Sequence, residues 1–145
     1  YEKYSNIAYE KLKSIPGVQV NRTNGAFYMS VVFKDGLLNL HQTLPIETPE
    51  ARALVEELTA DPQMQPDKRF VYYLLASTGI CLVPLSSFNT PLQGFRMTLL
   101  ELDEIEFRRI VERLVKSIEL YVASAGGESA LEGFKVSVTA GIGRR

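Results

Sequence analysis

The sequence predicts a two-layer α/β sandwich, in which a small, mostly antiparallel sheet of about three to four strands is covered by amphipathic helices. The predicted order of main elements is helix, strand, helix, helix, strand, strand, helix. A hairpin joins the last two strands, and this forces at least one antiparallel pair. The 145 residues, of which 46% are hydrophobic, suffice for one domain with a real core.

The first part of the chain predicts one helix and two strands. Residues 1–15 place apolar side chains at helical spacing, and Pro16-Gly17 ends the helix. A short strand is predicted at residues 18–20. Asn24-Gly25 is then a turn that leads into a mostly buried strand over residues 26–33.

The middle of the chain predicts a loop followed by two helices. Residues 36–47 contain four leucines without a clean period, which indicates a packed loop. One helix is expected over about residues 49–59, with Thr48 as its N-cap and a proline at its first position. The next is expected over residues 68–78, with Asp67 as its cap.

Two more strands follow the second of these helices. Gly79 is expected to end that helix in the left-handed conformation. Residues 80–83 predict a short apolar strand in which Cys81 is a small core residue. Residues 84–93 predict a loop, and residues 94–100 another strand.

The last helix has the clearest signature. Asp103 and Glu106 form a predicted capping box, and Leu102 with Phe107 a hydrophobic staple. Seven apolar residues then trace one helical face: Phe107, Ile110, Val111, Leu114, Ile118, Tyr121 and Val122. Gly126-Gly127 ends the helix, so residues 1–125 form the expected domain. Residues 126–145 are a tail, either mobile or with a strand over residues 134–138.

The composition excludes several classes of protein. Sixteen basic and seventeen acidic residues give a net charge of -1, which does not predict a nucleic-acid partner. No apolar run is long enough for a membrane span, and the first residues lack the basic-then-apolar pattern of a signal peptide. A single cysteine favours the cytoplasm. The single histidine, His41, has no second ligand nearby, so no metal site is expected.

Arg96 is the residue with the strongest functional potential. It stands between Phe95 and Met97 in a predicted apolar strand. A buried guanidinium needs an anionic partner, because an isolated buried charge is very unfavourable. That partner is either a carboxylate of the protein or a ligand, and the residues alone leave both open. A planar carboxylate fits the bidentate geometry of arginine well.

Three segments in order resemble a known family. They are Asn24-Gly-Ala-Phe-Tyr28, the run from Gly79-Ile80 through Val83-Pro84 to Ser86-Ser87-Phe88, and Phe95-Arg-Met-Thr98. With the long final helix, they resemble the C-terminal small domain of class I aminotransferases of fold type I. These are enzymes of amino-acid metabolism that depend on pyridoxal phosphate (PLP). The alanine, aspartate and aromatic aminotransferases are the most similar branches, and the resemblance covers residues 1–123.

The resemblance implies roles for particular residues. The arginine that matches Arg96 binds the α-carboxylate of the amino acid or 2-oxo acid substrate. The segment with Gly25, Phe27 and Tyr28 lies near the mouth of the active site and shapes substrate preference. Whether Phe27 or Tyr28 faces the cleft depends on the strand register. The small domain also closes against the large domain when substrate binds and excludes water.

The sequence departs from the family pattern in one loop. The family often has Val-Val-Pro-Gly-Ser-x-Phe-Gly before its Phe-Arg strand. Here Leu85 stands at the first of these glycines and Asn89 at the second. A divergent subgroup with an altered loop course is therefore expected, while the assignment of Arg96 is unaffected.

The resemblance also implies that much of the active site lies outside the chain. In the family, the lysine that forms a Schiff base with PLP, the aspartate at the pyridine nitrogen and the phosphate cradle belong to the large domain. None of the seven lysines here stands in the Ser-Lys context of the family. The chain is therefore expected to be a fragment that is inactive alone. The intact enzyme is expected to be a homodimer. The alternatives are a freestanding amino-acid-binding or regulatory module and a structural interaction domain.

Overall fold

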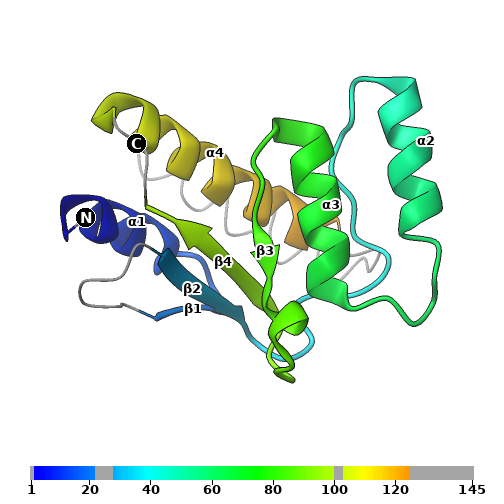
Figure 1. Cartoon of the computed structure of the whole chain (residues 1–145), viewed down its shortest axis with the longest axis horizontal. Helices are drawn as coiled ribbons and strands as arrows, with labels where there is room; N and C mark the ends of the chain where they lie inside the picture. Colours follow the sequence, from blue (N-terminus) through cyan, green and yellow to red (C-terminus); the bar gives the residue numbers. More distant parts are fainter. Residues whose placement is uncertain (1, 22–27, 100–102, 125–145) are drawn as a thin grey trace, which may run out of the picture.

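The chain forms the predicted two-layer α/β fold (Figure 1). A computed structural model describes residues 2–21, 28–99 and 103–124. Within these ranges there are four α-helices, one turn of 3-10 helix and a four-stranded sheet. In chain order they are α1 (Glu2–Leu12), β1 (Val18–Asn21), β2 (Tyr28–Phe33), α2 (Pro49–Leu58), α3 (Pro66–Thr78), β3 (Val83–Pro84), the 3-10 turn η1 (Leu85–Phe88), β4 (Gly94–Thr98) and α4 (Glu104–Ala123).

The sheet has the strand order β1-β2-β4-β3, and every neighbouring pair is antiparallel. Successive side chains of a strand point to opposite faces, so the register sorts the residues into two sets. Val31 lies opposite Phe95, and both are buried on the inner face. Ser30 lies opposite Arg96 on the outer face, where the side chains are partly or fully exposed.

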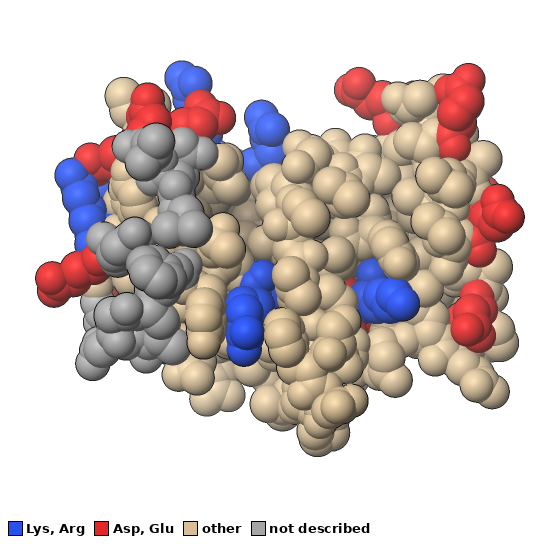
Figure 2. All heavy atoms as spheres, viewed as in Figure 1, with Lys and Arg blue, Asp and Glu red and all other residues tan. Residues whose placement is uncertain are grey.

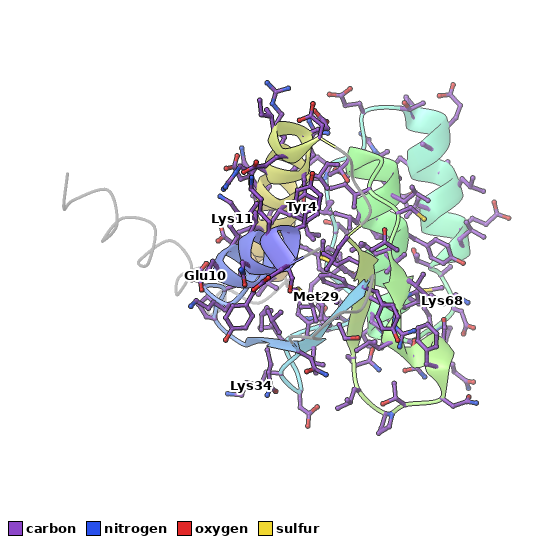
Figure 3. The ribbon with its side chains drawn as sticks, turned by 60° about the vertical axis from the view of Figure 1, so that its left-hand side comes forward. Tyr4, Glu10, Lys11, Met29, Lys34 and Lys68 are labelled. Atoms are coloured by element: carbon purple, nitrogen blue, oxygen red, sulfur yellow. The ribbon has the colours of Figure 1, made fainter. Side chains whose placement is uncertain are left out.

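The helices cover the inner face of the sheet and bury an aromatic core. Met29 of β2 lies in the interior between sheet and helices (Figure 3). The Phe70 ring of α3 meets Tyr121 of α4 edge-on, with ring centroids 5.0 Å apart, and it also contacts Phe33 at 5.7 Å. Helix α2 stands at one end of the molecule next to α3 (Figure 1). Val55 is the buried side chain of α2.

Most local signals of the sequence are confirmed. The Asp103 side chain accepts hydrogen bonds from the backbone N–H groups of Ile105 and Glu106, as a helix cap does. Gly79 ends α3 with φ of 80° in the left-handed region, where glycine is unstrained. The loop over residues 36–47 is packed, because Leu38 and other side chains in it are buried.

Four sequence predictions are wrong. The strand expected over residues 80–83 is instead the short strand Val83–Pro84. Thr48 occupies the N-cap position of α2, but its side chain makes no capping hydrogen bond. The cap position of α3 is Gln65, and the Asp67 side chain bonds to a different segment. Cys81 is exposed, because the chain alternates here and buries Leu82 instead.

Several predictions fall outside the described residues. These are the start of the second strand at residues 26–27, the Leu102 staple and the tail over residues 126–145. Among the described helices, none combines the length and the apolar character needed to cross a bilayer.

Candidate functional site

Arg96 lies on β4, a central strand of the sheet, and its side chain is on the outer face. Strand β4 carries it between β2 and β3, opposite Ser30 on one side and Val83 on the other. Its neighbours in sequence, Phe95 and Met97, point inward and are buried. The alternation of a half-buried strand therefore explains how an arginine stands in an apolar run while its own side chain is only partly buried.

Two aromatic rings contact the Arg96 guanidinium. Its central carbon lies 4.3 Å from the centroid of the Tyr28 ring and 4.2 Å from that of Phe88. A guanidinium is planar and weakly hydrated, and it stacks on aromatic faces with a favourable electrostatic contribution. A guanidinium that is held by ring contacts can still use the N–H donors in its plane for a bidentate contact with a carboxylate.

The positive charge of Arg96 has no counter-charge in the part of the chain that the structure describes. No described carboxylate forms a salt bridge with it, whereas Arg108 and Arg109 on α4 each pair with a glutamate. The Nε of Arg96 is buried without a hydrogen-bond partner among the described residues. An internally paired arginine was the structural alternative, and the described residues do not supply its partner. An unsatisfied buried donor is unfavourable by about 1–3 kcal/mol.

The surface around Arg96 is apolar and accessible. Tyr28, Val83 and Phe88 are exposed by 39%, 45% and 46% of their surfaces. Figure 2 shows that the face over β3 and α3 is largely uncharged with isolated basic groups, while acidic side chains gather at the end of the molecule that α2 occupies.

The structure accommodates both departures from the family pattern in the loop before β4. Asn89 follows η1 with φ of 57°, a left-handed conformation that asparagine tolerates better than most residues other than glycine. Leu85 is buried, and its side chain packs close to Gly94. The loop therefore makes the turn that places Phe88 over Arg96.

The other predicted site residues have different outcomes. Gly25 and Phe27 lie outside the described residues. Tyr28 is on the outer face of β2, on the same side of the sheet as Arg96, and the two side chains stack. Sequence reasoning missed Phe88 as a partner of Arg96. Its position after Pro-Leu-Ser-Ser was visible, but its direction depends on the course of the loop.

Comparison with known proteins finds an aminotransferase as a relative. Over 122 residues, or 84% of its length, the chain is 50% identical to an uncharacterized aminotransferase of Methanocaldococcus jannaschii. The chain is homologous to an aminotransferase. The chain spans only 28% of the length of that relative. It matches no protein-family model.

Two solved structures share the fold of the aminotransferase-related chain. An aminotransferase from Escherichia coli has a TM-score of 0.56 at 23% identity, over 83% of this chain and 24% of the other. The aspartate aminotransferase from Rhizobium meliloti has a TM-score of 0.57 at 22% identity, over 82% of this chain and 25% of the other. Similarity at this level of identity establishes the fold alone. Together with the sequence match, it confirms the predicted resemblance.

The described residues do not fit a PLP site by themselves. A lysine that reacts with an aldehyde cofactor is normally enclosed, because desolvation favours its neutral amine. The described lysines are exposed or partly exposed, and Lys11, Lys34 and Lys68 lie at the periphery (Figure 3). Lys3 and Lys11 are engaged in ion pairs with Glu104 and Glu112 at 2.5 and 3.0 Å. No group of three potential metal ligands occurs in the described ranges either.

Proposed function

We propose that this chain is the small domain of a PLP-dependent aminotransferase and that Arg96 binds the α-carboxylate of the amino acid or 2-oxo acid. One observation carries this proposal: the guanidinium stands on the outer face of the sheet, in contact with the rings of Tyr28 and Phe88, and no described carboxylate forms a salt bridge with it. The homology to an aminotransferase makes a substrate carboxylate the natural ligand. Residues outside this chain hold PLP and supply the chemistry of amino-group transfer.

The same geometry supports a role in closure over the active site. A substrate whose carboxylate bonds to Arg96 and whose amino group reacts elsewhere connects this domain to the rest of the enzyme. The exposed apolar side chains of Tyr28, Val83 and Phe88 then have a large domain to pack against. Closure removes water from the site, which strengthens the carboxylate–guanidinium interaction.

The test compares two Arg→Lys substitutions in the intact protein. Arg96→Lys keeps the charge but loses the bidentate contact. Because a hydrogen bond to a charged group contributes about 1.5–3 kcal/mol, kcat/KM should fall about 10- to 100-fold. The measurement is steady-state transamination with L-alanine, L-aspartate and L-tyrosine as donors and 2-oxoglutarate as acceptor. Arg108→Lys is the matched control, since Arg108 is an exposed arginine that pairs with Glu104 on α4.

A result in which both substitutions leave kcat/KM equally unchanged contradicts the proposal. Calorimetry of this chain alone with the same amino acids addresses the alternative of a freestanding binding module. Micromolar binding that is lost in Arg96→Ala supports that alternative and argues against a domain that needs the rest of an enzyme.

A further inference from the structure

A buried carboxylate outside the Arg96 site ties together the segment that leads to it. Asp67 stands in the first turn of α3, and its side chain is wholly buried. Its Oδ2 accepts hydrogen bonds from the backbone N–H of Ser86 at 2.9 Å and of Gly94 at 3.3 Å. Its Oδ1 accepts the hydroxyl hydrogen bond of Ser86 at 2.5 Å. All three donors belong to the two elements that flank one loop, Ser86 in η1 and Gly94 at the start of β4, far from Asp67 in the sequence.

These bonds fix both ends of the loop that joins η1 to β4. Ser86 lies two residues before Phe88, and Gly94 lies two residues before Arg96. The Gln93 side chain adds another connection, because its Oε1 accepts the backbone N–H of Asp67 at 3.0 Å. The two groups that stack on each other at 4.2 Å, the Phe88 ring and the Arg96 guanidinium, are therefore both carried by backbone anchored to Asp67.

Helix capping does not account for this arrangement. The cap position of α3 is Gln65, and the described hydrogen bonds of the Asp67 carboxylate all come from Ser86 in η1 and Gly94 in β4. Burying a carboxylate is strongly unfavourable unless its oxygens are hydrogen-bonded. The donors meet this requirement only when Ser86 and Gly94 are both in place. The carboxylate therefore stabilises one course of the loop against others.

We infer that Asp67 is a positioning residue for Arg96: by holding Ser86 and Gly94, it keeps the Phe88 ring over the guanidinium and fixes the plane of that group. Asp67 acts through the loop and does not contact the substrate. The effect on substrate binding rests on the proposed function of Arg96, whereas the effect on the stacking of Phe88 and Arg96 does not.

The stacking is tested by NMR of the full chain through the Arg96 Nε–H signal. Nuclei over the face of an aromatic ring are shifted upfield, so this signal reports both the Tyr28 and the Phe88 ring, and a Phe88 variant isolates the contribution of Phe88. Phe88→Ala removes the ring and should give the largest downfield shift of the Arg96 Nε–H signal. Asp67→Ala should reproduce most of it and add nothing in the Phe88→Ala background. Val111→Ala, a core change on α4 remote in sequence from the loop, should leave the signal in place.

Two more conservative substitutions test the inference when Asp67→Ala does not fold. Ser86→Ala removes one of the donors and should shift the Arg96 signal in the same direction by a smaller amount. Asp67→Asn can still accept the two backbone N–H groups and donate to the Ser86 hydroxyl, so it should keep the signal near its wild-type position. An Arg96 signal that is unchanged in Ser86→Ala and in every folded Asp67 variant overturns the inference.

The kinetic consequence is measured separately in the intact protein with the same donors and 2-oxoglutarate. Asp67→Ala and Phe88→Ala should each raise KM by about three- to tenfold, with a smaller change in kcat, and the double variant should be no worse than the poorer single one. Additive increases contradict action through Phe88. If the NMR signal moves but Arg96→Lys leaves KM unchanged, the positioning inference stands and the proposed substrate role of Arg96 fails. The reverse pattern refutes the positioning role of Asp67 alone.

Discussion

Replacing Gly94 with alanine places a methyl group against the neighbouring strand. A Cβ atom built on Gly94 lies 2.0 Å from the backbone oxygen of Val31 and 2.9 Å from the Cδ1 atom of Leu85. The Leu85 side chain can turn away, but the Val31 oxygen belongs to β2, which pairs with β4. The strands must therefore separate locally to admit one methyl group.

The magnitude follows from two contributions. Overpacking of a well-packed site destabilises by about 1–3 kcal/mol. Separation of the strands weakens one or two hydrogen bonds of the β2–β4 ladder, each contributing about 1 kcal/mol. Gly94→Ala should therefore lower the free energy of unfolding by roughly 2–5 kcal/mol, a large part of the total of about 5–15 kcal/mol for a typical domain.

Urea unfolding of the full chain, followed by far-UV circular dichroism, measures this difference. Gly79→Ala is the matched control, because Gly79 has φ of 80° and a methyl group added there meets no described atom within 4 Å beyond its own helix and chain neighbours. The free energy of unfolding of Gly79→Ala should be lower by about 1–2 kcal/mol, because alanine is strained in the left-handed conformation. If Gly94→Ala is no more destabilising than Gly79→Ala, the close approach of β2 and β4 at this point is wrong.

Two further predictions concern the dependence of stability on pH. Burial raises the pKa of the Tyr121 phenol, with partial opposition from nearby Arg69, although the hydroxyl has no hydrogen-bond partner among the described residues. The unfolded chain therefore loses this proton first, and stability should fall as the pH rises above about 10. Tyr121→Phe should lack this part of the alkaline loss and change the neutral-pH free energy of unfolding by less than about 1 kcal/mol; an unchanged alkaline slope in urea titrations contradicts this. Hydrogen bonds from Lys3 and then Arg108 lower the pKa of Glu104, so its contribution is present above the ordinary value of a glutamate and disappears as the pH falls through the lowered pKa. Glu104→Gln should lower Tm at pH 7, and the difference should vanish in acid; a difference that persists there refutes the ion-pair origin.

Features set by neighbours in the sequence were predictable without a structure. The Asp103 cap, the left-handed Gly79 and the buried face of α4 each depend on residues within a few positions of one another. Hydrogen bonds and side-chain periodicity act over a single helical turn at these places, so tertiary packing had little to change. The motif around Arg96 could also be recognised from the sequence, because particular residue types at particular spacings define it.

Features set by long-range contacts were not predictable in this way. Arg69 is buried and donates from Nε to the backbone oxygen of Gln42 at 3.0 Å, yet nothing local distinguishes it from other arginines on helices. Asp67 has the pattern of a helix cap, but the loop that reaches it comes from 19 or more positions later and offers three donors at once. A carboxylate bonds to the donors that folding brings to it, and sequence proximity does not decide which these are.

The sequence by itself determined the resemblance to aminotransferases, the two-layer fold and Arg96 as the residue with the strongest functional potential. The tertiary structure decided how that arginine is held. Tyr28 reaches it through the register of β2 and β4, and Phe88 reaches it through the course of the loop that Asp67 anchors. The reason is physical. A motif specifies which chemical groups are present. Ring stacking and ion pairing depend on distances of a few ångströms between segments that only the folded chain brings together.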